Sequence, residues 1–239
     1  MTAGMEVIND DNIYQIDDTY RNMQLIAGAS VGGMTHYVDA TQGIDYWYYD
    51  ITVYSAQAPI LALNGTTNWI TAGPPAFSGG TFQWRVYSQV NTAFNWYVFD
   101  LPAPIGNVGI EIFDASANLK FSGVRAPMKP KQVLFTPQSG GENSVTMPAG
   151  PTYAVHVLSP GSKGEAYGYI GEVCTGAGAY CYQYNWTGAF SISGNVISSH
   201  PSRHKWQDLY KDGDGFCGVY SGSTDQRLLI LDVSGIFFL

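Results

Sequence analysis

Apolar and polar residues alternate along much of this sequence, in short stretches that end at Gly, Pro, Asn or Asp. Alternation with a period of two is typical of a strand with one buried face, and no segment has the apolar spacing of a capped amphipathic helix. Short strands separated by regular turns are typical of β-sandwiches and jelly rolls. The sequence therefore predicts an all-β protein, an antiparallel β-sandwich or jelly-roll-like fold with little or no helix.

The stretch VGIEIFDASANLKFSG, residues 108–123, has the pattern of a β-hairpin. Residues 110–113 and 118–121 would form two antiparallel strands joined by a loop at 114–117. A loop of this type needs a left-handed residue at its fourth position, where Ala117 costs about 1 kcal/mol relative to Gly. If Ile112 pairs with Leu119, Ile110 faces Phe121 on the same apolar side, and Glu111 faces Lys120 as an opposite-charge pair on the other side.

The composition agrees with strands and tight turns, and it limits the choice of partners. Charged residues make up 13% of the chain, and there are 28 glycines and 17 tyrosines. The net charge of −8 argues against nucleic-acid binding, which needs a basic surface. Without a long apolar run or a secretion signal, we expect no membrane span and a protein made and kept in a cytosol. Three cysteines are expected to be thiols there: Cys174, Cys181 and Cys217.

A cluster of three prolines at 126–137, APMKPKQVLFTP, marks a candidate boundary. It predicts an N-terminal β-sandwich part at 1–127 and a Gly-rich C-terminal β part at 128–239. The second part would pack closely on the first or form one continuous domain with it.

No motif combines the residues and the context that catalysis or metal binding needs. Ser30 in GASVG matches G-x-S-x-G, but a nucleophile elbow needs a strand, a turn and a helix, and no helix follows here. Asp212, Asp214 and Gly215 begin like a calcium loop, but Ser223 stands where the closing Glu belongs, and only a calcium site of another geometry stays open. We therefore predict no catalytic residues, no cofactor, no resident metal and a protein that is not an enzyme.

Three strand-like segments are dense in aromatic residues: YWYYD at 46–50, FQWRVYS at 82–88 and FNWYVFD at 94–100. Aromatic rings can stack on the apolar faces of sugars, so these segments could form a glycan-binding platform. The same segments also fit a sheet that is packed on both faces, which is the simpler interpretation.

The C-terminal segment is apolar to its last residue. Residues 228–233, LLILDV, predict a strand covered on both faces, and Gly235 allows a bend after it. Four large apolar side chains follow, and they would be unfavourable in water. We predict that they contribute to an assembly interface with another subunit: Ile236, Phe237, Phe238 and Leu239.

Two stretches resemble a group of structural proteins from tailed bacteriophages and prophages. The first, AGMEVINDDNIYQIDDTYRNMQLIAGASV at 3–31, is similar to the short motif with which these proteins open. The second is FDLPAPIGNVGIEIFDASANLKFSG at 99–123, in which Ala117 stands where relatives often have Gly. MPAGPTYAV at 147–155 and LLILDVSG at 228–235 are also similar. The matching residues of the first stretch are Gly4, Val7, Asn9, Asp10, Gln15, Ile16, Asp17, Tyr20 and Asn22.

The resemblance implies a structural component of the virion, in the tail tip or adsorption apparatus. Such a protein would be assembled in the host bacterial cytoplasm, as a homo- or hetero-oligomer with other tail proteins. Two alternatives stay open: a carbohydrate-binding module that recognises a host surface glycan, and a glycan hydrolase or esterase. A broad apolar surface would favour the structural role, converging Trp and Tyr side chains the glycan module, and Ser30 or a carboxylate pair in a cleft the hydrolase.

Overall fold

The alternating segments form β-strands in the computed structural model, and no helix occurs in the residues that it describes. All strand pairings there are antiparallel. The predicted all-β, antiparallel class is therefore confirmed. The described residues are 7–8, 14–16, 23–39, 44–65, 67–101, 111–114, 116–122, 125–137, 141–168, 179–212 and 221–236.

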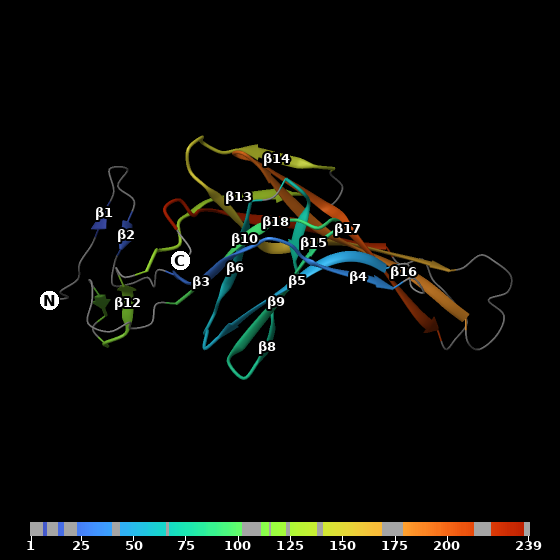
Figure 1. The fold of residues 1–239 in the computed structure, drawn as a ribbon, viewed down its shortest axis with the longest axis horizontal. Coiled ribbons are helices and arrows are strands. Elements are labelled where there is room, and N and C mark those ends of the chain that lie inside the picture. The colour runs from blue at the N-terminus through green and yellow to red at the C-terminus, as the bar shows by residue number, and fades with distance from the viewer. Residues whose placement is uncertain are drawn as a thin grey trace.

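Most strands belong to one 14-stranded sheet that folds into two layers, while β1–β2 and β11–β12 form separate hairpins (Figure 1). The strands are β1 (Val7–Ile8), β2 (Tyr14–Ile16), β3 (Gln24–Val31), β4 (Thr35–Asp39), β5 (Ile44–Tyr54), β6 (Ile60–Asn64), β7 (Ile70–Ala72), β8 (Ala76–Ser78), β9 (Thr81–Ser88), β10 (Phe94–Asp100), β11 (Glu111–Phe113), β12 (Leu119–Ser122), β13 (Pro130–Thr136), β14 (Asn143–Thr146), β15 (Tyr153–Gly168), β16 (Ala179–Ser193), β17 (Val196–Asp212) and β18 (Ser221–Asp232).

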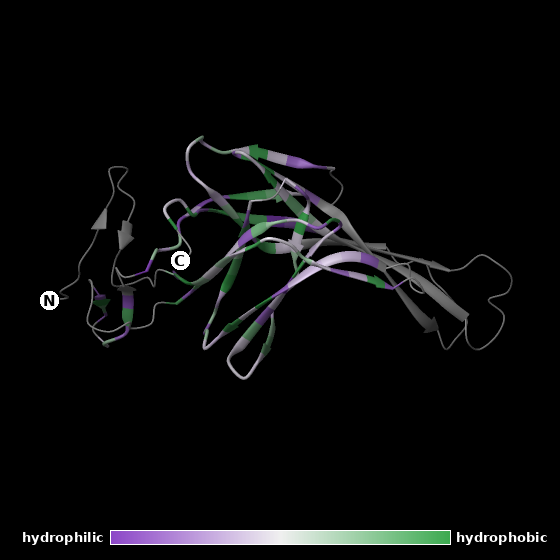
Figure 2. Ribbon diagram, viewed as in Figure 1, coloured by the Kyte–Doolittle hydropathy of each residue, from purple (hydrophilic) through white to green (hydrophobic). Residues whose placement is uncertain are grey.

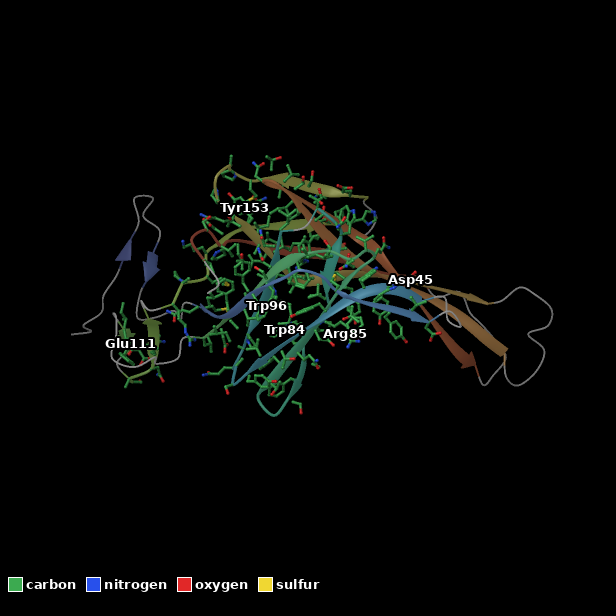
Figure 3. The ribbon with its side chains drawn as sticks, viewed as in Figure 1. Asp45, Trp84, Arg85, Trp96, Glu111 and Tyr153 are labelled. Carbon is green, nitrogen blue, oxygen red and sulfur yellow. The ribbon has the colours of Figure 1, made fainter. Side chains whose placement is uncertain are left out.

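The main core lies between the two layers. Layer A contains β3, β10, β6, β15, β18 and β13, and layer B contains β4, β5, β8, β9, β7, β16, β17 and β14. Trp84 and Val86 of layer B are buried in the same cluster as Val98 and Leu228 of layer A. Figure 3 marks Trp84 and Trp96, from the two layers, in the body of the molecule. Each large apolar side chain buried here stabilises the fold by about 1.5–3 kcal/mol.

Two long strands make the sheet continuous from layer A to layer B. β15 starts in layer A between β6 and β18, and beyond a bulge between Val157 and Ser159 it also pairs with β16. β16 has a bulge between Thr187 and Ala189, after which it pairs with β7 of layer B. A bulge adds one residue to a strand and bends it, so these bulges fit strands that change layer.

Strands from before and after the proline cluster lie next to one another in both layers. Leu63 of β6 is opposite Val155 of β15, and Ile70 of β7 is opposite Phe190 of β16. All four residues belong to the main core. Segments 1–127 and 128–239 therefore share both layers of the sheet.

A buried chain of hydrogen bonds also joins the layers. The hydroxyl groups of Thr136 in β13 and Ser199 in β17 lie 2.6 Å apart, and Ser199 donates to the Gln226 side-chain oxygen in β18 at 2.7 Å. All three residues are 0% exposed. A buried polar group without a partner is costly, so this chain stabilises the fold only while it is complete.

The predicted hairpin forms, but its predicted register is wrong. The structure pairs Phe113 with Leu119, and beyond a bulge Glu111 with Ser122, instead of Ile112 with Leu119. Ala117 is left-handed, with φ of 62°, and its N–H donates to the Asp114 carbonyl at 3.0 Å. The turn therefore closes one residue away from the expected position, and it needs the left-handed residue that the sequence predicted.

Asp114 explains why this turn is preferred. Its carboxylate accepts N–H groups of Ser116 and Asn118 and the Asn118 side-chain amide. These hydrogen bonds, those of Asn118 first, lower the pKa of Asp114 to about 2. Lys120 lies 3.3 Å from the same carboxylate and so pairs with the turn, and Glu111, which was expected opposite Lys120, is opposite Ser122.

The interior strand predicted at 228–233 is the end of β18 and the residue after it. β18 lies between β13 and β15, and Leu228, Ile230 and Leu231 are 0% exposed. Gly235 has φ of 78°, in agreement with the predicted bend. Ile236 is partly buried against residues of this chain, and residues 237–239 lie outside the described part. The interface expected at 236–239 therefore stays a prediction.

Candidate functional site

Layer B has one buried and one partly exposed face. On β5 and β9 the buried row includes Ile51, Trp84 and Val86, each at most 3% exposed. The alternate residues point away from the core, because cross-strand partners lie on the same side of a sheet. We call this outward row the tyrosine face: Tyr37, Tyr46, Tyr48, Asp50, Tyr54, Arg85 and Tyr87.

The rings of the tyrosine face contact one another around Tyr46. Its ring centroid lies 5.2 Å from that of Tyr37, 5.4 Å from that of Tyr87 and 6.2 Å from that of Tyr48. The last two contacts are edge-to-face, which is a favourable geometry for aromatic pairs. Tyr37 and Tyr54 remain 41% and 72% exposed. The face is therefore ordered by its own contacts and open to solvent.

One ion pair lies within this row of rings. The guanidinium of Arg85 donates two hydrogen bonds of 2.7 Å to the carboxylate of Asp50 on the neighbouring strand. It also lies over the Tyr48 ring, 4.3 Å from the centroid, in a cation–π contact. Figure 3 labels Arg85 in the body of the molecule, close to Trp84, the residue before it on β9. The pair fixes both side chains and leaves the centre of the face electrically near neutral.

The protonation of the tyrosines reflects this environment. Burial raises the pKa values of Tyr46 and Tyr87 above the usual value, and the nearby Arg85 charge acts in the opposite direction. The hydrogen bonds to Asp50 raise the pKa of Arg85. The phenols therefore stay neutral near pH 7, where they can both donate and accept hydrogen bonds.

Layer A, in contrast, is apolar on its outward side as well. Phe99 and Leu231 are 0% exposed there, in a second cluster separate from the main core. Toward β13 this side becomes open, since Val133, opposite Leu229, is 51% exposed and Phe135 is 45% exposed. We call this outward side the apolar face: Ile60, Ala62, Tyr97, Phe99, Val133, Phe135, Ala154, Leu229, Leu231, Val233 and Ile236.

Colouring by hydropathy makes the contrast visible. In Figure 2, β6 of layer A is largely green, whereas β5 of layer B is largely white with purple segments. Strands with both faces covered are apolar at successive positions, and strands with one open face alternate. The two layers therefore follow these two sequence patterns.

A partly open pocket of about 380 Å³ lies beside the loop between β5 and β6, and Tyr54, Asp100 and Arg125 are among its lining residues. Asp100 is 4% exposed, and its two oxygens accept the N–H groups of Gln57 and Ala58 at 2.8 Å. Among the described residues that line the pocket, Asp100 is the one acidic side chain, so no second described carboxylate faces it. This arrangement fastens the loop and does not provide the carboxylate pair of a glycosidase.

The structure describes some of the residues singled out above as catalytic or metal-binding candidates. Ser30 is an exposed residue within β3, opposite Asn95, and not at a strand-to-helix turn. One of the four histidines, His156, is partly buried and contacts the Leu61 carbonyl at 2.8 Å, and burial lowers its pKa. Asp212 ends β17 in the structure. Asp214 and Gly215 of the calcium-like loop lie outside the described residues, as do Cys174 and Cys217, so the prediction of free thiols there stays a prediction.

Two further searches concern the described residues alone. They contain no group of three or more His, Cys, Asp or Glu side chains placed to hold a metal ion. No helix in this part of the chain has the length and apolar character needed to cross a membrane.

The three aromatic segments differ in how fully their rings are packed. The packed-sheet interpretation is confirmed for β10, where Phe94, Tyr97 and Phe99 are at most 3% exposed. On β5 and β9 the rings instead alternate between the core and the tyrosine face. The sequence analysis missed the Arg85–Asp50 pair, although the available signal was a charged residue within each of two alternating aromatic strands.

Comparisons of this chain with protein-family models, with curated proteins and with solved structures find no match.

Proposed function

We propose that this protein is a non-enzymatic structural component of a tailed-bacteriophage virion, located in the tail tip or adsorption apparatus and acting through contacts with other tail subunits. The sequence resemblance at 3–31 and 99–123 supports the kind of particle. In this proposal the protein is assembled in the host bacterial cytoplasm as part of a homo- or hetero-oligomer.

The observation that carries the assembly role is the open end of the apolar face. Val133 and Phe135 are about half exposed on one side of β13, beside the buried cluster that includes Leu231. Arg227, opposite Phe135, has its guanidinium 5.7 Å from the centroid of the Phe135 ring, so a charged group borders this exposed apolar surface. Exposed apolar side chains beside polar groups are typical of protein–protein contacts. Burial of both side chains by a neighbouring subunit would favour association by a few kcal/mol, on the order of 1.5–3 kcal/mol for each one fully buried.

The described carboxylates support a scaffold more than a hydrolase. Asp50 is bound by Arg85, and Asp100 accepts two backbone N–H groups. Asp114 closes its own turn through Ser116 and Asn118. Each of these carboxylates therefore has a structural partner, as expected of a rigid β-scaffold.

The test is the incorporation of variants into particles. A phage that lacks the gene for this chain would be grown in host cells that supply the wild type or the Val133→Asp/Phe135→Asp variant. The amount of the chain in purified particles would then be measured by quantitative mass spectrometry. We expect the double variant, which places two charges in the contact, to reduce incorporation about tenfold or more. Phe77→Asp is the matched control, because Phe77 is 63% exposed on β8, outside the apolar face.

The outcomes separate the two parts of the proposal. Absence of the wild-type chain from purified particles would show that it is not a virion component. Normal incorporation of a folded Val133→Asp/Phe135→Asp variant would show that the apolar face is not the assembly contact. Equal losses with Phe77→Asp would also contradict the assignment to that face.

A further inference from the structure

We propose that the tyrosine face of layer B is a binding site for a neutral oligosaccharide. This site lies on the opposite side of the sandwich from the apolar face and does not depend on the assembly role. Its chemistry combines rings with hydrogen-bonding groups that are fixed by protein contacts.

Aromatic rings and hydrogen-bonding groups share the tyrosine face. Sugars present apolar C–H patches and hydroxyl groups on the same ring, so a protein site for them needs aromatic surface beside donors and acceptors. Tyr46 and Tyr48 supply ring surface and phenol groups, and Arg85 and Asp50 supply charged donors and acceptors. Apolar side chains alone, as on the other face, would not satisfy the hydroxyl groups of a sugar.

The groups of the tyrosine face are also preorganised. Arg85 is held by two 2.7 Å hydrogen bonds to Asp50 and by its contact with the Tyr48 ring. Tyr46 is held between Tyr37, Tyr48 and Tyr87 at centroid distances of 5.2–6.2 Å. Side chains that are already ordered lose little conformational entropy when a ligand binds.

The tyrosine face is both exposed and extended. The side chains of Arg85 and Asp50 are 42% and 30% exposed, and Tyr37 is 41% exposed. The rings lie along neighbouring strands β4, β5 and β9 and form an extended surface on the sheet. Such a surface suits several consecutive sugar units of a chain better than a single terminal sugar.

The charges around the tyrosine face favour a neutral oligosaccharide over an acidic one. Asp50 neutralises Arg85, the chain carries a net charge of −8, and Asp39 ends the neighbouring strand β4. A uronic- or sialic-acid chain would meet no uncompensated cation among these residues and would be repelled by the protein as a whole. We therefore assign a neutral glycan to this face.

The experiment is a titration of the full chain, with ¹³C-labelled tyrosine, against neutral hexasaccharides of glucose, mannose, galactose and N-acetylglucosamine and against hexagalacturonate. We expect at least one neutral hexasaccharide to shift the signals of Tyr37, Tyr46 and Tyr48 while the buried Tyr97 signal stays in place. Tyr48→Ala should weaken the apparent affinity about tenfold, and Phe135→Ala, an exposed ring on the apolar face, should leave it unchanged.

Any of four results would overturn the proposal. Failure of all four neutral hexasaccharides to shift the tyrosine signals would overturn it. Stronger binding of hexagalacturonate would contradict the neutral assignment, and unchanged affinity in Tyr48→Ala would place binding elsewhere. Concentration-dependent shifts of the same tyrosines without sugar would identify the face as a contact between two copies of the chain.

Discussion

The two outward faces of this sandwich differ although the layers beneath them share one core. The outward side of layer A is apolar and mostly buried, with Phe99 and Leu231 at 0% exposure. The outward side of layer B consists of tyrosines around the Arg85–Asp50 pair and is open to solvent. One scaffold therefore presents two chemically different surfaces, one apolar and mostly buried, and one of aromatic rings around an ion pair.

The largest expected effect concerns the buried part of the apolar face. Phe99→Ala should lower the free energy of unfolding by about 3–5 kcal/mol, because the residue is packed as fully as a core residue. Tyr48→Ala, the matched change on the tyrosine face, should cost about 1 kcal/mol or less. Urea denaturation of both variants measures the difference. Equal losses would mean that the two faces do not differ in packing.

A medium effect tests whether the two faces are mechanically independent. Ser199→Ala removes the hydroxyl group that joins Thr136 to Gln226 across the layers, and we expect a loss of about 1–3 kcal/mol. Amide hydrogen exchange should then become faster in both layers together. Ser144→Ala, at an exposed position in β14, should change stability by no more than about 0.5 kcal/mol. Faster exchange confined to one layer would show that the chain of hydrogen bonds does not couple them.

The smallest expected effect is a change in the pKa values of the tyrosines on one face and not on the other. Burial raises the pKa values of Tyr46, Tyr87 and Tyr97, but only the first two have the lowering influence of Arg85. Arg85→Met should therefore raise the titration midpoints of Tyr46 and Tyr87 further and leave that of Tyr97 unchanged, as measured by ¹³C NMR between pH 8 and pH 12.

The direction of the related stability change follows from the same shifts. A phenol whose pKa is raised in the folded state contributes stability below its unfolded pKa of about 10 and loses this contribution as the pH rises through the folded value. Stability should therefore fall as the pH rises above about 10. A fall that begins near neutral pH would have to come from other groups.

The sequence predicted those features that depend on local pattern. Leu228 and Ile230 lie in the covered strand that their nearly continuous apolar run predicts. Ser30 lies within β3 and not at a strand-to-helix turn, as the residues that follow it indicate. The tyrosine face was not predicted, because it depends on which strands become neighbours. Asp50 meets Arg85 only after β5 pairs with β9, 35 positions along the chain.

The hairpin shows a second limit of pattern reasoning. Alternation alone favoured Ile112 opposite Leu119, but the hydrogen bonds of Asp114 and the left-handed Ala117 determine where the turn closes. A shift of one residue in the pairing turns every side chain of a strand to the opposite face of the sheet. The conformation of the turn therefore sets the register here, although the alternation along both strands favours another register. The bulge beyond this pair adds a further offset that alternation does not indicate.

The passage of β15 and β16 from one layer to the other has a consequence for how the protein bears force. In a sandwich with two separate sheets, the layers could slide past each other by rearranging only apolar side chains. Here the layers are parts of one hydrogen-bonded ladder, and β15 is bonded to β6, β18 and β16 along its length. A pull that shears one layer against the other must break backbone hydrogen bonds, so tension applied to one outward face is carried through the ladder to the opposite face.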